Sequence, residues 1–328
     1  MPLDTTPAAT GTDLRSRVRG AMARLSISQA EVARRADIPP STLSQYMNDR
    51  YPGDVGPVED KLARWLETQA VTADVTELLP KLPSYVETPT GARIIAGLRY
   101  AQSARTITII YGAPGVGKTR SLRKYRLMAS AVYIVTADPM LAQLGALLDR
   151  IATVLGLTDG RRDPATLRKA IIAKLMGSGG LLIVDEAQQL TDKAIEGIRA
   201  IHDAVNEDVD DDGVGLGVAL CGNPSLYARI FGRGRGHDFS QVTSRIGKPI
   251  RIEGVQDGDV RAIAAAFGLT GADELDAARE IARRPGGLRL VEQTLKQAWL
   301  LAAGETPQTR PGLEHLQASF ADLMRDAD

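Results

Sequence analysis

Apolar residues between positions 13 and 67 recur at the spacing of helices. Leu14 and Val18 begin one apolar stripe, and Leu62 and Leu66 belong to another. Three prolines then fall between positions 79 and 89, and proline removes backbone donors and disfavours helix. We therefore predict a wholly helical N-terminal domain over residues 1–67 and an extended linker over residues 68–91.

The pattern changes after the linker to short β-rich runs that alternate with helical segments. The runs are nearly continuous in apolar residues, which is typical of parallel strands covered on both faces. They occupy residues 106–111, 131–136, 181–184, 214–221 and 250–252. Helical patterns follow at 259–267, 272–284, 287–303 and 313–324. We predict an α/β core with a parallel sheet over residues 92–254 and a small helical domain over residues 255–328.

Composition narrows the class of protein. The 328 residues are 44% hydrophobic and 24% charged, with a formal net charge of zero, so any nucleic-acid surface has to be local. Aromatic residues make up only 4%, which weakens a base-stacking role. A single cysteine, Cys221, excludes an internal disulfide. With no signal peptide and no membrane-length apolar run, we expect a cytoplasmic protein without a membrane partner.

A phosphate-binding loop connects the first predicted strand to the next helix. The pattern is Gly112, four further residues, Gly117, Lys118 and Thr119. Glycines let backbone N–H groups curl around phosphates, Lys118 would reach the β- and γ-phosphates, and the Thr119 hydroxyl would hold Mg²⁺. The expected nucleotide-binding residues are Gly112, Pro114, Gly115, Val116, Gly117, Lys118, Thr119 and Asp185. We expect ATP and Mg²⁺ as cofactors.

Acidic and amide side chains end the later strands. Asp185 is placed to bind Mg²⁺ together with Thr119, and Glu186 is placed to polarise the attacking water. The pair therefore indicates hydrolysis rather than sensing. Asn223, which ends the next strand, would orient that water or contact the γ-phosphate, although Asn223-Pro224 is also a common way to start a turn.

Residues 26–48 carry the pattern of a helix-turn-helix, with two short helical patterns flanking a tight break. Val32, Ala33, Ala36, Ile38, Leu43 and Tyr46 would pack its helices together. Asp37 occupies the turn position that often prefers glycine, and Asp tolerates the left-handed backbone there. Ser41, Thr42, Ser44, Gln45 and Asn48 would face a DNA groove, with Arg50 on a phosphate.

Taken together, the phosphate-binding loop, the acid pair and the helical C-terminal domain resemble the AAA+ ATPases. The resemblance implies that Asn223 is the first sensor and that Arg289, in Gly287-Leu288-Arg289, is the second. It also implies that Arg245 is an arginine finger acting on a neighbouring subunit, so that activity needs oligomerisation. Each arginine has the alternative of a surface ion pair.

The domain order further resembles the phage Mu transposition protein B family. The markers are residues 44–53, 85–88, 183–187, 244–246 and 285–289 and the phosphate-binding loop. The resemblance implies ATP-bound subunits that polymerise as a helical filament on duplex DNA with little sequence preference. It also implies a transposase that is recruited to that DNA and stimulates hydrolysis. No residues for strand transfer are visible, so the transposase would be another chain.

Basic residues that could contact DNA are spread over the core. The candidates are Arg123, Lys124 and Arg126 after the phosphate-binding loop, Arg161 and Arg162, and Arg233 and Arg235 in a glycine-rich segment. Solvated helix faces explain most of them equally well. The acidic run 207–212 would repel DNA, and we interpret it as a solvated loop facing away from the duplex.

Two other functions remain open. A transcription regulator would read an operator through the helix-turn-helix and sense nucleotide, but Glu186 favours turnover and no dimerisation domain is evident. A helicase-loader or clamp-loader type of AAA+ assembly factor shares the core but rarely needs a helix-turn-helix. One unpaired module rarely gives operator-grade specificity, so we interpret it as an accessory arm on an ATP-gated polymer.

Overall fold

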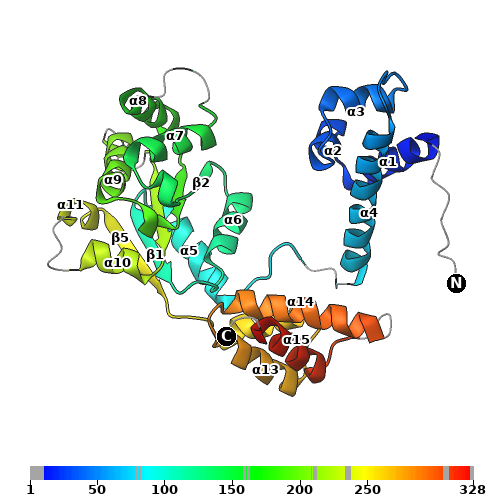
Figure 1. Cartoon of the computed structure of the whole chain (residues 1–328). Helices are drawn as coiled ribbons and strands as arrows, with labels where there is room; N and C mark the ends of the chain where they lie inside the picture. Colours follow the sequence, from blue (N-terminus) through cyan, green and yellow to red (C-terminus); the bar gives the residue numbers. More distant parts are fainter. Residues whose placement is uncertain are drawn as a thin grey trace. The chain divides into compact units, whose positions relative to one another are not determined.

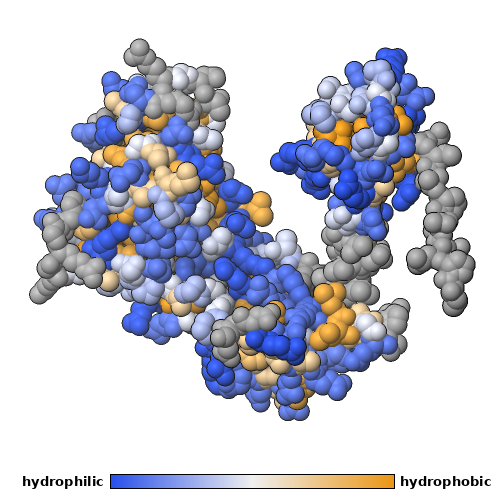
Figure 2. All heavy atoms as spheres, viewed as in Figure 1, coloured by the Kyte–Doolittle hydropathy of each residue, from blue (hydrophilic) through white to orange (hydrophobic). Residues whose placement is uncertain are grey.

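The computed structural model describes residues 11–78, 80, 83–157, 160, 163–207, 209, 213–232, 238–305 and 310–325, with the side chains of 11, 12 and 71–78 left out. The chain divides into two compact units at residues 79 and 80, and each unit is described by itself (Figure 1). On the face shown in Figure 2, hydrophilic residues predominate on both units.

The first unit is helical, as predicted. Its helices are α1 (Gly11–Leu25), α2 (Gln29–Arg35), α3 (Pro40–Met47) and α4 (Gly56–Leu78). The residues expected to pack the second and third helices together are all buried in one apolar cluster: Val32, Ala33, Ala36, Ile38, Leu43 and Tyr46. Asp37 between them has φ = 54°, so this turn does take the left-handed backbone.

The predicted linker begins too early. Helix α4 continues to Leu78, so residues 68–78 belong to the first unit rather than to an extended connection. The reason is local, because no proline or glycine occurs between residue 68 and Pro80 to end the helix.

The second unit contains a parallel sheet of five strands, which confirms the predicted sheet. The strands are β1 (Ile107–Gly112), β2 (Val132–Thr136), β3 (Leu181–Asp185), β4 (Gly217–Gly222) and β5 (Ile246–Ile252). Their order across the sheet is β2-β3-β4-β1-β5, and every pairing is parallel.

Two strands begin more than one residue away from the predicted start, whereas the other strand boundaries differ by at most one residue. Strand β4 begins at Gly217 rather than at 214, and β5 begins at Ile246 rather than at 250. The apolar pattern does not reveal the start of β5, because Gly247, Lys248 and Pro249 are exposed and carry no apolar alternation. An edge strand tolerates proline because its outer side makes no ladder hydrogen bonds.

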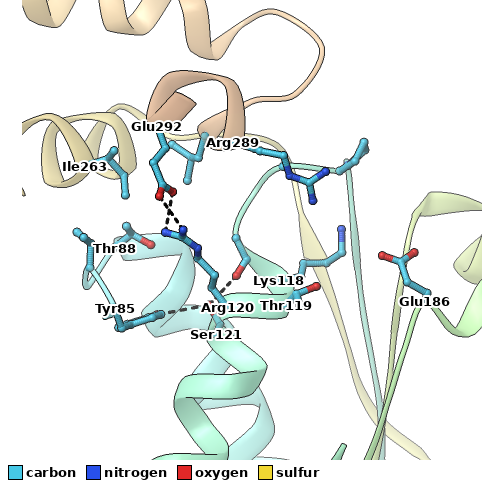
Figure 3. Close-up of a pocket in the computed structure, with 15 residues that line it drawn as sticks. Tyr85, Thr88, Lys118, Thr119, Arg120, Ser121, Glu186, Ile263, Arg289 and Glu292 are labelled. Atoms are coloured by element: carbon cyan, nitrogen blue, oxygen red, sulfur yellow. Dashed lines mark hydrogen bonds and ion pairs between the residues drawn. The ribbon is translucent and has the colours of Figure 1, made fainter. Parts of the chain in front are cut away.

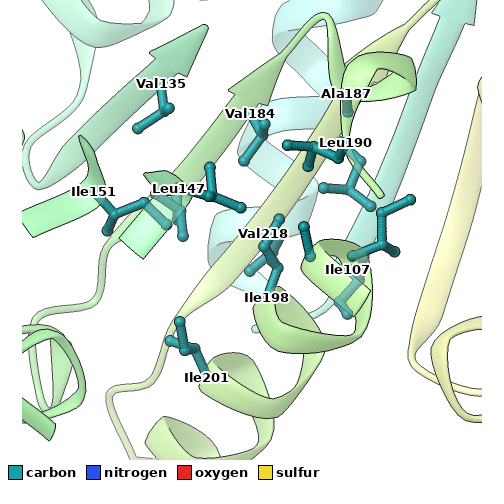
Figure 4. Packing of buried hydrophobic residues seen from close by; sticks show 14 of the residues in the cluster. Ile107, Val135, Leu147, Ile151, Val184, Ala187, Leu190, Ile198, Ile201 and Val218 are labelled. Carbon is teal, nitrogen blue, oxygen red and sulfur yellow. The ribbon is translucent and has the colours of Figure 1, made fainter. Parts of the chain in front are cut away.

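Helices cover both faces of the sheet (Figure 1). The helices and short 3₁₀ turns of this core are α5 (Pro89–Ser103), α6 (Lys118–Met128), η1 (Pro139–Leu141), α7 (Leu144–Val154), α8 (Pro164–Leu175), η2 (Ala187–Gln189), α9 (Asp192–Asn206), α10 (Pro224–Phe231) and α11 (Ser240–Thr243). Alternate residues of β1 supply both cores. Ile107 and Ile109 pack with α7–α10, the core drawn in Figure 4, whereas Ile110 packs with α5 and α6.

The last part of the second unit is a bundle of four helices, close to the predicted ranges. These are α12 (Asp257–Ala266), α13 (Ala272–Ala282), α14 (Leu288–Glu305) and α15 (Leu313–Arg325). Val291, Leu295 and Leu316 lie in a separate apolar core of this bundle. None of the helices in the described ranges combines the length and apolar character that a bilayer-crossing segment needs.

Candidate nucleotide site

The phosphate-binding loop lies between β1 and α6 and is held against the helical bundle. Gly115 and Gly117 have φ angles of +80° and +92°, which favour glycine. The Gly115 carbonyl accepts a hydrogen bond of 3.0 Å from the Leu288 N–H at the start of α14. A Cβ atom on Gly115 would lie 2.0 Å from the Gly286 carbonyl oxygen. Glycine is therefore required here both for backbone conformation and for close approach of the bundle.

Lys118 is the first residue of α6 and is only 8% exposed to solvent. Its Nζ donates hydrogen bonds to the carbonyl oxygens of Gly112 at 2.8 Å and Ala113 at 2.9 Å. Burial lowers the pKa of the Lys118 amine, while the nearby charges of Glu186 and Asp185 oppose that shift. The amine is thus fixed at the loop, where an incoming phosphate can replace the carbonyl oxygens as its partner.

Thr119 and Asp185 form an oxygen pair at the floor of the site. The Thr119 hydroxyl donates to Asp185 Oδ2 at 2.7 Å, and Asp185, at the end of β3, is 1% exposed. Burial raises the pKa of Asp185, and the hydrogen bond from Thr119 works against that shift. A hydroxyl and a carboxylate beside a phosphate-binding loop suit Mg²⁺, which prefers oxygen ligands. The residues present therefore fit a magnesium nucleotide.

Glu186 lies next to this pair with a left-handed backbone (φ = 55°) and lines the same cleft. Gln188 Nε2 donates to Glu186 Oε2 at 2.6 Å, while Gln188 Oε1 accepts the Asn223 N–H at 3.3 Å. Gln188 thus connects the acid at the end of β3 to the end of β4. The sequence does not predict this role for Gln188, because nothing in its spacing distinguishes it from other polar residues.

The cleft above the loop is closed by two segments far apart in the sequence (Figure 3). Arg120 on α6 makes an ion pair of 2.7 Å with Glu292 on α14. Tyr85, which falls in the predicted linker, lines the cleft, with its hydroxyl 3.4 Å from Ser121 Oγ. Further apolar lining residues are Val86, Ile263 and Leu288. This apolar end of the cleft suits a nucleobase, and its opposite end suits phosphates.

Comparisons with known proteins agree with this arrangement. Residues 244–323 match the family model described as "Mu B transposition protein, C terminal", and residues 101–230 match the model of an AAA domain. The ATP-dependent target DNA activator B of Escherichia phage Mu is 31% identical over 316 residues, covering 96% of each chain. The Mu-like prophage FluMu DNA transposition protein B of Haemophilus influenzae is 36% identical, covering 82% of this chain and 90% of the relative. The chain belongs to the Mu transposition protein B family.

Among solved structures, the Aeropyrum pernix ORC1 protein in complex with DNA has a similar fold. Its TM-score is 0.51 at 17% identity, covering 76% of this chain and 69% of that chain. That likeness concerns the fold alone. The AAA domain match and the ATP-dependent relative identify this member of the transposition protein B family as a nucleotide-binding AAA+ ATPase.

The remaining predicted site residues of this family member lie in different places. Arg289, the second residue of α14, lines the cleft with Lys118 and Glu186 (Figure 3). Asn223 caps α10, and its Oδ1 accepts from the Ser225 N–H at 2.9 Å. The turn-starting role considered for Asn223 is therefore present in the structure, at the end of the strand beside β3.

Arg245 lies at the opposite end of the sheet from the cleft. It directly precedes β5, whose first residue pairs with Ile107, whereas the phosphate-binding loop follows the other end of β1. Six residues of strand separate the two ends, or roughly 20 Å. Arg245 Nε makes an ion pair of 3.1 Å with Asp203, the alternative that its surface position allows, and its side chain is 49% exposed.

The predicted DNA contacts are mostly at the surface. In the first unit Ser41, Ser44, Gln45, Asn48 and Arg50 are exposed, and Thr42 is partly exposed. In the second unit Arg123 and Arg126 are exposed, while Lys124 Nζ lies 5.6 Å from the centre of the Tyr85 ring. Arg161, Arg162, Arg233 and Arg235 lie outside the described residues, as does most of the acidic run 207–212.

Proposed function

We propose that this protein is an ATP-dependent, largely sequence-nonspecific DNA-binding ATPase that forms a helical filament on duplex DNA and delivers that DNA to a transposase. Its phage Mu relative is named an ATP-dependent target DNA activator. The observation that carries the proposal is the distance between Arg245 and the cleft of the same chain, roughly 20 Å along the sheet. At that distance Arg245 would not reach the nucleotide of its own chain, so it would act on the nucleotide of a second subunit.

Within one chain, the residues of the cleft divide the work of hydrolysis. Lys118 would bind the β- and γ-phosphates, and Thr119 and Asp185 would hold Mg²⁺. The metal would neutralise charge that develops on the phosphate oxygens. Glu186 would accept a proton from the attacking water. Its contact with Gln188 at 2.6 Å supports this role, because it fixes the carboxylate beside the cleft.

Asn223 and Arg289 would contact the nucleotide and couple its hydrolysis to movements of helices α10 and α14. Asn223 caps α10, so a contact of its amide with the γ-phosphate or the attacking water would couple the nucleotide to that helix. Arg289 lies in the first turn of α14, and a contact with phosphate would close the bundle over the cleft. Arg245 would act on the nucleotide of the neighbouring subunit, where an arginine is worth roughly 10³ to 10⁵ in rate.

DNA would be held by many weak contacts rather than by one strong site. The first unit would contribute a helix-turn-helix, with exposed polar residues of α3 toward a groove and Arg50 on a phosphate. A few phosphate contacts for each subunit give weak, salt-sensitive binding. ATP-gated contacts between neighbouring subunits would make that binding cooperative. We assign residues 92–254 to the ATPase core and 255–328 to a lid.

Electron microscopy of the protein on random-sequence duplex DNA tests this function. We expect continuous filaments with ATP and Mg²⁺, and bare DNA without nucleotide. Lys118→Ala removes the amine at the phosphate-binding loop and should abolish the nucleotide-dependent coating. If wild-type protein with ATP and Mg²⁺ forms neither filament nor ring, the proposal is wrong. A footprint confined to one palindromic sequence would instead favour a transcription regulator.

A further inference from the structure

Two hydrogen bonds fix the backbone of Arg245. Its carbonyl oxygen accepts from the Ile107 N–H at 3.1 Å and from the Thr106 hydroxyl at 2.9 Å. Ile107 is the first residue of β1 and Thr106 directly precedes it, so Arg245 is attached at the end of the strands that lies opposite the cleft. Only the side chain of Arg245 therefore remains to be oriented.

Asp203 on α9 holds that side chain. Arg245 Nε donates to Asp203 Oδ1 at 3.1 Å, and its Nη1 donates to Ser244 Oγ at 3.2 Å. A guanidinium has five N–H donors, so these contacts leave donors on the outer nitrogens for a second anion. The Asp203 carboxylate at Nε thus orients the Arg245 guanidinium and leaves N–H donors of Nη1 and Nη2 free for another anion.

Asp203 is itself held from two sides. Arg199 Nη1 donates to Asp203 Oδ2 at 2.6 Å, and His202 Nδ1 lies 3.3 Å from Oδ1, with its other ring nitrogen 3.0 Å from the Arg105 carbonyl. The Asp203 side chain is 26% exposed. Burial alone would raise the pKa of Asp203, but the contacts with His202, Arg245 and Arg199 outweigh it and lower that pKa. The carboxylate is therefore ionised and has little freedom to move.

We propose that Asp203 is a positioning residue for Arg245, directing its guanidinium to the nucleotide of the neighbouring subunit. This inference rests on the proposed trans-acting role of Arg245. Asp203 touches no nucleotide, and it acts by holding the arginine in one conformation before the subunits meet. Its loss should therefore lower kcat of the assembled protein, while KM for ATP and assembly on DNA stay unchanged.

Steady-state ATP hydrolysis by the full chain, with saturating duplex DNA and Mg²⁺, tests the inference. We expect Asp203→Ala to lower kcat about tenfold, equivalent to about 1.4 kcal/mol, with KM unchanged. Asp203→Asn keeps an oxygen acceptor for Nε and should recover most of the activity, which a defect in folding would not allow. The matched control is Asp276→Ala, which also breaks an aspartate–arginine pair, but on the surface of α13. It should leave kcat unchanged.

Two further measurements separate positioning from a general structural role. The double variant Asp203→Ala/Arg245→Ala should be no slower than Arg245→Ala alone, because the two residues act as one unit. Subunits carrying Asp203→Ala, mixed with Glu186→Gln subunits that have an intact Arg245, should regain activity in trans. Additive losses in the double variant, or no gain on mixing, would overturn the inference.

The two proposals fail in different ways. If Arg245→Ala leaves kcat unchanged, the trans-acting role of Arg245 is wrong and the inference falls with it. If Arg245→Ala lowers kcat strongly while Asp203→Ala does not, only the positioning role is wrong. A rise in kcat with Asp203→Ala would also overturn the inference, since it would show that Asp203 restrains the arginine.

Discussion

Gly115 and Gly117 have similar backbone angles but different surroundings. Both φ angles lie in the left-handed region, at +80° and +92°. A Cβ atom on Gly115 would collide with the backbone of Gly286, whereas nothing lies within 4 Å of the position of a Cβ on Gly117. At the scale of the residue, Gly115 therefore carries a constraint from the bundle in addition to the constraint from the turn.

Gly115→Ala should lower the affinity for ATP at least about tenfold, because the clash separates the loop from α14. The left-handed backbone adds a cost of about 1–2 kcal/mol. Gly156→Ala is the matched control, since Gly156 has φ = +76° and open space around it. Calorimetric titration with ATP and thermal unfolding should show a loss of stability in both variants but weaker binding in Gly115→Ala alone. Equal ATP affinities in the two variants would contradict the steric argument.

Glu186→Gln should lower the rate of hydrolysis about 10² to 10⁴-fold, the range expected for loss of a general base. Nucleotide binding should persist, because Lys118, Thr119 and Asp185 are unchanged. Phosphate release gives the rate, and a competitor-DNA chase gives the lifetime of the DNA-bound protein, which should lengthen. Rapid dissociation of the variant from DNA would count against Glu186 as the residue that polarises water.

At the scale of elements, three polar contacts between described residues join the ATPase core to the helical bundle. The Leu288 N–H binds the Gly115 carbonyl, and Arg120 pairs with Glu292. The third contact is buried, because Asp259 at the start of α12 is 0% exposed. Its carboxylate accepts from the Thr90 N–H at 2.9 Å and from the Thr90 hydroxyl at 2.6 Å. These contacts attach the bundle to both α5 and α6.

Thr90→Val removes the hydroxyl but keeps the shape of the side chain. We expect the free energy of unfolding to fall by about 1–3 kcal/mol, because the buried Asp259 carboxylate is deprived of a partner. Thr153→Val is the control, since its hydroxyl bonds the backbone of its own helix at an exposed position. Denaturant titration of both variants measures the two losses. Equal losses would mean that the hydrogen bond from Thr90 to Asp259 contributes no additional stability.

Glu292 makes the contact between α14 and α6 dependent on pH. Burial by itself would raise the pKa of Glu292, but hydrogen bonds from Lys296 and Arg120 outweigh it and lower that pKa below the ordinary value of 4.5. A lowered pKa in the folded state means that the stabilisation is fully present above pH 4.5 and disappears as the pH falls through the lowered value.

Glu292→Gln should therefore lower the free energy of unfolding by about 0.5–1 kcal/mol at pH 7, a modest effect because Arg120 and Lys296 are partly exposed. The difference from wild type should shrink as the pH falls below 4.5. Glu280→Gln, which breaks an exposed pair with Arg283, should change little at either pH. Denaturant unfolding at several pH values measures this, and a difference independent of pH would contradict the ion-pair explanation.

At the scale of the whole molecule, charge is balanced and the two units have separate cores. Formal net charge is zero, and several basic residues of the first unit are already paired, such as Arg34 with Glu31 and Lys61 with Asp37. We therefore do not expect a single subunit to bind DNA non-specifically with high affinity. Binding should instead depend on assembly and on the few basic residues that reach phosphates.

Arg50→Ala should weaken DNA binding similarly for all sequences. It should also reduce the slope of log affinity against log salt by about 0.9 for each phosphate that the arginine no longer neutralises. Arg34→Ala is the control, because Arg34 is exposed but paired with Glu31. Fluorescence anisotropy over a range of salt concentrations with ATP gives both slopes. An unchanged slope for Arg50→Ala would remove Arg50 from the DNA surface.

Local patterns in the sequence determined the secondary structure and the centre of the site. Strands showed as apolar runs, and the phosphate-binding loop, Asp185 and Glu186 showed as motifs. These features can be predicted from the sequence because each depends on residues that are close together in the chain. A buried strand needs a run of apolar residues, and the phosphate-binding loop needs the backbone freedom of glycine. Errors occurred where the local signal was weak. Helix α4 has no breaker before Pro80, and β5 begins with an exposed edge.

Only the tertiary structure decided which distant residues meet. Arg120 and Glu292 are 172 residues apart, Thr90 and Asp259 are 169 apart, and Asp203 and Arg245 are 42 apart. The sequence around a polar residue does not indicate a partner so far away in the chain, because the packing of whole helices and strands decides which residues meet. The placement of Tyr85 over the cleft has the same cause. The sequence by itself therefore determined the chemistry of the nucleotide site, and the fold decided what closes the cleft and which residue holds Arg245.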